Sequence, residues 1–483
     1  MSKIGLRNAW FQVHKWIGLT LAILIIPLSL TGAALVWDEA LDHALNPQRY
    51  ATSGSNTLDP QRYVAAARGV LEPGDRIAAL TLPDAPWRQR AGIAELCAVL
   101  GAARGEARFV GGAVRDSLLG LDVADVDLAT RHPPEDVIDL LARARIRAVP
   151  TGLAHGTITA VLADGSPVEV TTLRSDVATD GRHATVAFTD DWREDAARRD
   201  FTINALYADP QTGEIFDYFG GLADLAAHRV RFIGDPLQRI AEDHLRILRF
   251  FRFHARFGDM PDAAGLDACT ARANDLMALS RERIAAELLK LLVAPNAVAT
   301  LRLMVERGIF RPVLPEITAE GVEALADVAG SETLAGLSPD PIRRLAAALP
   351  RDAKIGEDVA ARLKLSNAQR KRIVSALTPD LAAPQALSYR LGQEGAIDRV
   401  LLHIPAAMER VLAVRQILDW VAPSFPVNGG AIVARGVDKG PDVARLLKLV
   451  EHQWIAENFP SAERANAIAD AAVAQFLSDS SIA

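Results

Sequence analysis

The chain has 483 residues, half of them hydrophobic, which is too long for one compact core and predicts roughly two to four domains. Its 53 basic and 60 acidic residues give a net charge of −7, which argues against indiscriminate binding to polyanions and requires a local basic patch for any contact with nucleic acid. Its 2 cysteines, Cys97 and Cys269, lie far apart in the sequence and indicate neither a disulfide framework nor a zinc site.

An uncharged stretch near the N-terminus has the length of a membrane span. Residues 17–37 would form a helix of about 31 Å, close to the roughly 30 Å of a bilayer core. Trp16 and Trp37 lie at its ends, where aromatic rings favour the membrane interface. A buried core helix and a signal peptide are the alternatives. We expect residues 1–50 to form a membrane segment and residues 51–87 to form a linker.

The next distinctive element is a glycine pair in the stretch FVGGAVRDSLLG at 109–120. The pattern predicts a strand, then Gly111 and Gly112, then the start of a helix. Glycine lets a phosphate approach the backbone closely, and N–H groups at a helix start attract anions. An ordinary turn is the alternative.

Two aspartates follow in the run VADVDLA. Asp125 and Asp127 stand two apart in an alternating pattern, so on a strand their carboxylates face the same side. Mg²⁺ prefers such oxygen ligands and completes its shell with water and substrate phosphates, which indicates phosphoryl transfer. Glu169, in the alternating strand PVEVTTL, is a candidate third carboxylate. A solvated strand edge is the alternative for the aspartate pair.

Arginines that could bind a triphosphate come next. Arg198 and Arg199 in RRDFTINAL can make charge-assisted hydrogen bonds to phosphate oxygens. The alternative is that Arg199 forms a surface ion pair with Asp195, four residues before it on a helix.

Asp243 and Arg246 stand three apart on a predicted helix and would share one face. A carboxylate beside a guanidinium complements the amino donor and ring-nitrogen acceptor of cytosine and adenine, and mismatches guanine and uracil. Such a pair could select CTP and ATP without a nucleic-acid template. A solvated ion pair between these two residues is the alternative.

The same segment predicts a basic stripe. Arg246, Arg249, Arg252 and Arg256 recur at helical spacing and could receive the phosphates of an RNA 3′ end. The interleaved phenylalanines are expected in the core rather than as stacking platforms, because most of them fall off the arginine face.

Together these motifs resemble the bacterial class II tRNA nucleotidyltransferase/poly(A) polymerase family. The resemblance is carried by GGAVRDSLLG at 111–120, DVDLAT at 125–130, PTGLAHGTITAV at 150–161, RRDFTINAL at 198–206, GDPLQRIAEDHLRILRFFRF at 234–253 and SRERIAAELLKLL at 280–292. The N-terminal stretch separately resembles the first membrane helix of the PepSY-associated family, with residues 51–87 as a truncated continuation.

The resemblance implies an α+β fold, with a small mixed-sheet nucleotidyltransferase head at 88–232, a helical neck at 233–295 and a helical body and tail at 296–483 that bind tRNA. It implies a Mg²⁺-dependent enzyme that adds CCA to tRNA from CTP and ATP. Asp125, Asp127 and Glu169 would be catalytic, with the aspartates as metal ligands, and Arg249, Arg252 and Arg256 would contact RNA. The expected nucleotide-binding residues are Gly111, Gly112, Arg115, Asp116, Arg198, Arg199, Asp200, Asn204, Glu242, Asp243 and Arg246.

Two other functions stay open from the sequence. A poly(A) polymerase of the same family would share the head, and a membrane-anchored sensor or interaction protein would retain the fold without reacting. Positive charges before the span and acidic residues after it predict a cytoplasmic N-terminus, which would export the rest of the chain. Because ATP, CTP and tRNA are cytoplasmic, we expect the catalytic part to stay inside, through inverted insertion or because residues 1–87 come from a gene fusion or a misassigned start.

Overall fold

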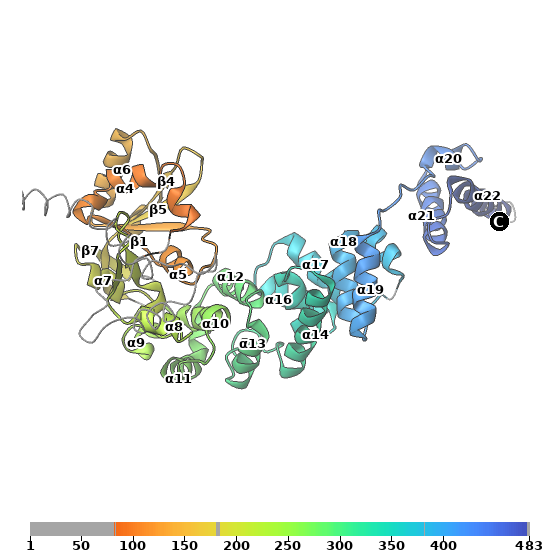
Figure 1. Ribbon diagram of the computed structural model, residues 1–483. Helices are drawn as coiled ribbons and strands as arrows, with labels where there is room; N and C mark the ends of the chain where they lie inside the picture. The colour runs from red at the N-terminus through yellow and green to blue at the C-terminus, as the bar shows by residue number, and fades with distance from the viewer. Residues whose placement is uncertain (1–81, 83, 180–183, 381, 481–483) are drawn as a thin grey trace, which may run out of the picture. The chain divides into compact units, whose positions relative to one another are not determined.

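The computed structural model describes residues 82, 84–179, 184–380 and 382–480 (Figure 1). The predicted membrane segment, with its span at 17–37, lies outside the described residues, as do residues 51–81 of the predicted linker. Within the described ranges, no helix is both long enough and apolar enough to cross a bilayer.

A mixed sheet forms the first part of the described chain. Its strands lie in the order β3-β4-β5-β2-β1-β8-β9, in which β2 and β5 run parallel and the other neighbours run antiparallel. The strands are β1 (Ala107–Val110), β2 (Val126–Thr130), β3 (Arg147–Gly152), β4 (Thr157–Val161), β5 (Pro167–Thr172), β8 (Leu206–Ala208) and β9 (Ile215–Asp217), and a separate hairpin pairs β6 (Arg174–Thr179) with β7 (Ala184–Phe188). The predicted mixed-sheet head is confirmed.

Short helices surround this sheet. They are η2 (Pro86–Gln89), α4 (Ile93–Val99), η3 (Ala102–Arg104), α5 (Gly112–Leu118), α6 (Pro134–Arg143), η4 (Leu153–His155), α7 (Trp192–Ala197), η5 (Thr202–Asn204) and α8 (Gly221–Ala226). Figure 1 shows α4 and α6 beside one another, and the buried Leu96 and Leu141 of these helices join Leu128 of β2 in one core.

Alternation along two strands puts acidic groups on the face of the sheet away from this core. In β5, Val168 and Val170 are buried, so Glu169 between them points to the opposite face. Asp127 of β2 is the register partner of Glu169 in the parallel pair, so both carboxylates share that face. The sheet therefore presents polar groups where β2 and β5 lie side by side.

The core of the head begins before the predicted boundary at residue 88. Trp87 is buried, its Nε1 donates a hydrogen bond to Ser117 Oγ at 2.8 Å, and its ring packs edge-on against Phe109 with centroids 4.7 Å apart. The backbone N–H of Leu82 donates to the carbonyl of Gly213 at 2.6 Å. A single tryptophan carries no periodic signal, which is why the sequence placed it in the linker.

From residue 236 onward the described chain is helical, as predicted. The elements are α9 (Pro236–Glu242), α10 (Arg246–Phe257), α11 (Ala263–Ala271), η6 (Ala273–Ala278), α12 (Arg281–Leu292), α13 (Ala297–Glu306), α14 (Ala319–Ala335), α15 (Pro341–Ala348), α16 (Ala353–Arg362), α17 (Asn367–Leu377), α18 (Pro384–His403), α19 (Ala407–Leu418), α20 (Gly429–Val433), α21 (Pro441–Ala456) and α22 (Ala462–Ser480).

Polar residues define where many of these helices start. Each accepts a hydrogen bond from a backbone N–H of the first turn, which would otherwise lack a partner: Asp235, Asp262, Ser280, Thr318, Asp340, Asp352, Ser366 and Asn428. Proline at the first helical position of α9, α15 and α18 adds a preset φ.

Candidate active site

One cavity of about 880 Å³ collects most of the residues that the sequence singled out. Its lining includes the glycine pair, the two aspartates and the predicted base-reading pair. The predicted site residues along it are Gly111, Gly112, Arg115, Asp125, Asp127, Glu169, Arg198, Arg199, Asp200, Asn204, Asp243, Arg246, Arg249 and Arg252. Segments more than a hundred residues apart in the sequence therefore meet at one place.

The glycine pair forms the turn between β1 and α5. Gly111 has φ +70°, a left-handed conformation that disfavours side chains, and its N–H donates to the carbonyl of Leu206 at 3.1 Å. Helix α5 then begins at Gly112. The predicted order of strand, glycine turn and helix is confirmed, and the turn exposes its backbone to the cavity.

The aspartates lie where β2 begins. Strand β2 starts at Val126, so Asp125 directly precedes it and Asp127 is its second residue. Burial, together with the neighbouring carboxylates of Glu169 and Asp125, raises the pKa of Asp127 to about 6 against the opposing effect of Arg199. Facing carboxylates of this kind favour either a proton or a cation between them.

This arrangement fits a hydrated Mg²⁺ better than a closed metal site. Among the described residues, no group of three acidic, histidine or cysteine side chains converges closely enough to hold a metal. Mg²⁺ is commonly bound by one or two carboxylates together with substrate phosphates and water, which matches the pair Asp125 and Asp127. Glu169 shares their face but does not complete a three-ligand group with them.

The paired arginines Arg198 and Arg199 are anchored by a buried carboxylate. Asp195 accepts hydrogen bonds from Arg198 at 2.8 Å, from Arg199 at 3.2 Å and from the hydroxyl of Tyr207 at 2.6 Å. Burial would raise the pKa of Asp195, but the two guanidinium groups hold it at about 2. The ion pair considered as an alternative exists, but it is buried rather than on the surface, and it aims both arginines along the cavity.

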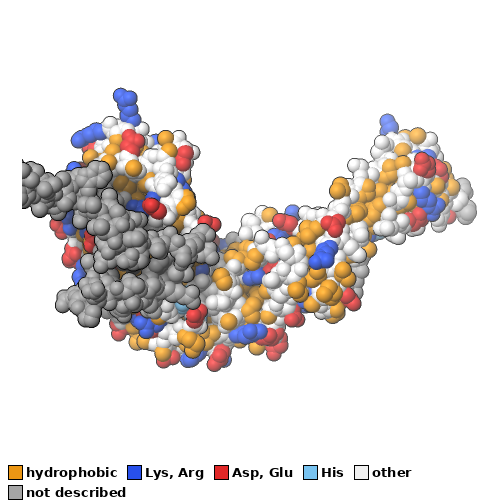
Figure 2. All heavy atoms as spheres, viewed as in Figure 1, with side chains coloured by type: hydrophobic (Ala, Val, Ile, Leu, Met, Phe, Trp, Pro, Cys, Tyr) orange, Lys and Arg blue, Asp and Glu red, His pale blue; other side chains and the backbone are white. Residues whose placement is uncertain are grey.

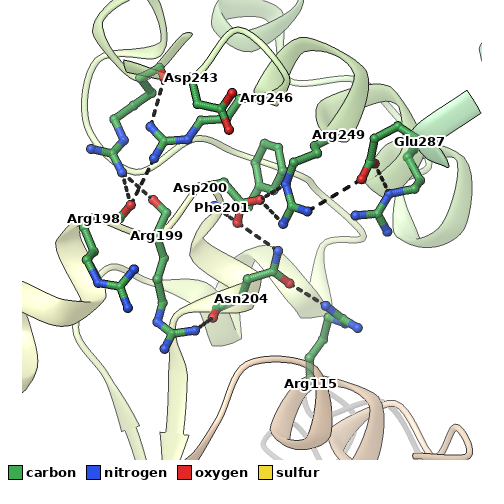
Figure 3. A network of polar contacts seen from close by, with 12 residues as sticks. Arg115, Arg198, Arg199, Asp200, Phe201, Asn204, Asp243, Arg246, Arg249 and Glu287 are labelled. Atoms are coloured by element: carbon green, nitrogen blue, oxygen red, sulfur yellow. Dashed lines mark hydrogen bonds and ion pairs between the residues drawn. The ribbon is translucent and has the colours of Figure 1, made fainter. Parts of the chain in front are cut away.

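A second buried network connects the head to the helices that follow it (Figure 3). Asp200 accepts from Asn204 Nδ2 at 3.0 Å and from Arg249 Nε at 2.7 Å, and Asn204 accepts in turn from Arg115. Burial would raise the pKa of Asp200, but Arg249 and Asn204 hold it at about 2. Asp200 is therefore an ionised acceptor that fixes cationic side chains along the cavity.

Asp116 does not line the cavity. It is a buried residue of α5 that accepts hydrogen bonds from Arg115 Nε at 2.7 Å and from Arg256 Nη2 at 3.1 Å, and Arg256 does not line the cavity either. Asp116 therefore orients Arg115, which does line the cavity, and its own contact with a nucleotide stays a prediction.

The helix predicted to carry Asp243 and Arg246 is broken between them. Helix α9 ends at Glu242, Asp243 is extended with φ −149° and ψ 108°, and α10 begins at Arg246. Both residues line the cavity (Figure 3), but through a two-helix junction rather than one helix face. The ion pair between them that was considered as the alternative does not form, since Asp243 pairs with Arg283 at 2.9 Å and Arg246 with Glu242 at 2.6 Å.

Arg246 is held in place by three acceptors. Its Nη1 donates to Glu242 Oε2 at 2.6 Å and to the carbonyl of Arg239 at 2.9 Å, and its Nη2 donates to the carbonyl of Arg198 at 3.2 Å. A guanidinium has five N–H donors, so among the described residues two donors of Arg246 remain for a ligand. Glu242 does not line the cavity and acts on it through Arg246.

The predicted basic stripe is largely neutralised by the chain's own carboxylates. Arg249 pairs with Asp200, Arg252 with Glu287, and Arg256 with Asp116. Figure 2 likewise shows acidic and basic side chains interspersed over the visible face of the helical part. The phenylalanines of α10 are buried as predicted, and Phe253 lies under the guanidinium groups of Arg249 and Arg252.

Several cavity residues were missed from the sequence. They are Val126, Thr159, Pro167, Arg174, Phe253 and Lys290. Lys290 had a usable signal, because it stands seven residues after Arg283 in the motif SRERIAAELLKLL and so shares a helix face with it. Arg174 had none, since it follows β5 without a pattern.

Two family models match the chain. The Poly A polymerase head domain matches residues 107–231, and the probable RNA and SrmB-binding site of polymerase A matches residues 263–320. Mitochondrial CCA tRNA nucleotidyltransferase 1 of Mus musculus is 38% identical over 372 residues, which span 72% of this chain and 82% of the relative. The CCA-adding enzyme of Latilactobacillus sakei is 31% identical over 385 residues, spanning 74% and 92%.

Solved structures agree with these matches. The Bacillus stearothermophilus CCA-adding enzyme in complex with CTP superposes with a TM-score of 0.59 at 26% identity, covering 78% of this chain and 94% of that one. The Thermotoga maritima CCA-adding enzyme complexed with tRNA gives 0.58 at 19% identity, covering 80% and 95%. Because its sequence identity is low, the similarity to the Thermotoga maritima enzyme shows a common fold and no more.

Proposed function

Since the chain belongs to the family of CCA-adding tRNA nucleotidyltransferases, which shares its head domain with poly(A) polymerases, we propose that it adds C, C and A to tRNA 3′ ends from CTP and ATP. Each addition releases pyrophosphate and uses no nucleic-acid template. The observation that carries the proposal is the single cavity that joins paired carboxylates, a glycine turn, arginines and the pair Asp243 and Arg246. These are the parts that template-free nucleotidyl transfer requires.

In the proposed reaction the 3′-oxygen of the tRNA attacks the α-phosphorus, and the bond to the β-phosphate breaks. Asp125 and Asp127 would hold Mg²⁺, which when bound activates the hydroxyl and neutralises the charge that grows on the leaving pyrophosphate. Arg198 and Arg199, oriented by Asp195, bind the triphosphate. Arg115, fixed by Asp116 and Asn204, lies beside the glycine turn.

Base selection is assigned to the junction between α9 and α10. The carboxylate of Asp243 accepts a hydrogen bond from the amino group of cytosine or adenine. One of the two remaining N–H donors of Arg246 donates a hydrogen bond to the ring nitrogen of the same base. Guanine and uracil would place a carbonyl against the carboxylate, leaving buried polar groups unpaired at about 1 to 3 kcal/mol each. Arg249 and Arg252 are proposed RNA contacts at the cavity wall, and Arg256 a more distant one.

The test uses tRNA lacking its 3′ end, offered CTP alone. We expect incorporation of CMP, followed by AMP when ATP is added. Asp125→Asn and Asp127→Asn should each lower kcat by at least about 100-fold, because a metal ligand is lost. Asp122→Asn is the matched control, since Asp122 is exposed in the same loop and does not line the cavity.

Other results of this assay would overturn the proposal. ATP polymerisation without CMP incorporation would make the protein a poly(A) polymerase. Absence of any incorporation, with the fold intact, would favour the non-catalytic sensor.

We also propose, from the sequence alone, that residues 17–37 anchor the chain in a membrane with the catalytic part in the cytoplasm. The full chain should then sediment with membranes after a carbonate wash. External protease should leave the catalytic part intact in whole cells. Recovery in the supernatant would contradict the anchor, and cleavage would contradict the topology.

A further inference from the structure

Helix α12 reaches the cavity through Lys290. Arg283, Glu287 and Lys290 stand at positions i, i+4 and i+7, which share a side of the helix. Glu287 is buried and pairs with Arg252 and, at 3.8 Å, with Arg249, both on α10. Since Arg249 also pairs with Asp200 of the head, as Figure 3 shows, α12 is fixed relative to the cavity floor.

From this fixed helix, Arg283 reaches the carboxylate of Asp243. Its Nη2 donates to Asp243 Oδ2 at 2.9 Å, and the backbone N–H of Leu245 donates to Oδ1 at 3.1 Å. Each carboxylate oxygen therefore has one partner from the protein and one lone pair left for a ligand. Asp243 lies outside both flanking helices, so no helical packing sets its side-chain rotamer.

We propose that Arg283 is a positioning residue that fixes the orientation of the Asp243 carboxylate and thereby determines which nucleobases the site accepts. The inference rests on the proposed function. Arg246 is held independently, by Glu242 and two backbone carbonyls, so its orientation does not depend on Arg283. Without Arg283, the Leu245 N–H is the one hydrogen-bond donor among the described residues that still restrains the carboxylate. The carboxylate of Asp243 can then turn away from the base, and the free-energy penalty for binding guanine or uracil, which present a carbonyl there, falls.

If the ion pair between Arg283 and Asp243 served only to stabilise the fold, its loss would lower the melting temperature and leave nucleotide selection unchanged. The side chains of Arg283 and Asp243 are 39% and 29% exposed, and ion pairs with that access to water contribute little to folding stability. Loss of the pair should therefore alter nucleotide selection while leaving the melting temperature nearly unchanged.

The experiment compares the full-length protein with Arg283→Gln, Arg283→Lys and a control, Arg302→Gln. Arg302 also makes an ion pair from the helical part, with Glu323 at 2.7 Å, but Glu323 does not line the cavity, whereas Asp243, the partner of Arg283, does. Dissociation constants for CTP, ATP, UTP and GTP are measured by titration without tRNA. Values of kcat/KM are then measured for CTP and UTP with tRNA lacking its 3′ end.

We expect Arg283→Gln to lower the preference for CTP over UTP by about tenfold, as loss of one hydrogen bond to a charged group predicts, with Arg283→Lys partly restoring it. The melting temperature and the Arg302→Gln preference should match the wild type. An unchanged preference, or an equal loss of affinity for all four nucleotides, would overturn the inference. Failure of the wild type to add CMP would overturn the proposed function instead, and the ratio of dissociation constants would still decide the role of Arg283.

Discussion

At the scale of single residues, the position of Asp127 links the protonation of the site to metal binding. Its carboxyl faces Glu169 across two parallel strands, and burial with these acidic neighbours raises its pKa to about 6, from 3.8. The raised pKa means that the metal-free folded protein binds this proton more tightly than the unfolded chain does. The metal-free fold should therefore lose stability as the pH rises from about 4 through 6.

Metal binding should have the opposite dependence on pH. Because only the ionised carboxylate binds a cation, the affinity for Mg²⁺ should fall roughly tenfold per pH unit below about 6 and level off above it. Metal titrations between pH 5 and 8 measure this. Asp127→Asn should bind more weakly and lose the inflection near 6. An affinity that stays constant across that range in the wild type would show that Asp127 is not a ligand.

At the scale of elements, the turn between β1 and α5 can be tested with a second glycine as the control. Gly111→Ala places a side chain at φ +70° and ψ −121°, which costs a residue other than glycine about 1 to 3 kcal/mol, although no described atom lies closer than 3.5 Å to the added Cβ. Gly105→Ala also places a side chain at positive φ, +71°, but its ψ of 22° lies in the left-handed helical region and costs less; no described atom lies within 4 Å of its Cβ, and it lies away from the cavity. Both variants should melt at a lowered temperature, Gly111→Ala at the lower of the two.

The two glycine variants should differ in nucleotide binding. Only Gly111→Ala should raise the KM for CTP, because its Cβ lies beside Arg199 and the backbone that lines the cavity. Equal KM values for both variants would contradict a role of the turn in binding phosphate.

Elements with a local sequence pattern could be predicted from the sequence. Contacts between residues far apart in the sequence could not, because they depend on how the chain folds. The alternation around Asp127 and the glycine turn are short-range patterns, and both elements were found. The parallel register of Asp127 with Glu169, and the contact of Asp200 with Arg249 49 residues later, depend on how distant segments meet. The break at Asp243 was missed because its flanks favour helix on both sides.

At the scale of the whole molecule, charge pairing explains how an acidic chain can carry a cationic cavity. Arg249, Arg252 and Arg256 look like a free basic stripe in the sequence, but each has a carboxylate partner in the fold. Paired arginines keep a fixed direction and attract polyanions less than free ones do. The net charge of −7 and a polyanionic substrate are therefore compatible, because the cavity lining itself holds eight basic and five acidic side chains.

The same pairing ties together the helices that follow the neck. Asp398 of α18 accepts from Arg343 of α15 at 2.8 Å and from Arg372 of α17 at 2.6 Å, and Arg343 also donates to Glu332 of α14 at 2.9 Å. Asp398, Arg343 and Glu332 are 1 to 6% exposed. Removing Asp398 takes one carboxylate from two guanidinium groups, although Arg343 keeps Glu332 and Arg372 keeps Asp340 at 3.0 Å, so the cost is at most about 3 to 5 kcal/mol.

We therefore expect Asp398→Asn to destabilise α14, α15, α17 and α18 together, because a single carboxylate connects α15 and α17 to α18 and Arg343 extends the connection to α14. Hydrogen exchange should show faster exchange in all four helices and unchanged exchange in the sheet of the head. Glu323→Gln removes an exposed pair with Arg302 and should leave hydrogen exchange in these helices nearly unchanged. Faster exchange confined to α18 would show that these helices unfold independently, since a cooperative unit transmits the loss of one buried charge to every helix that shares it.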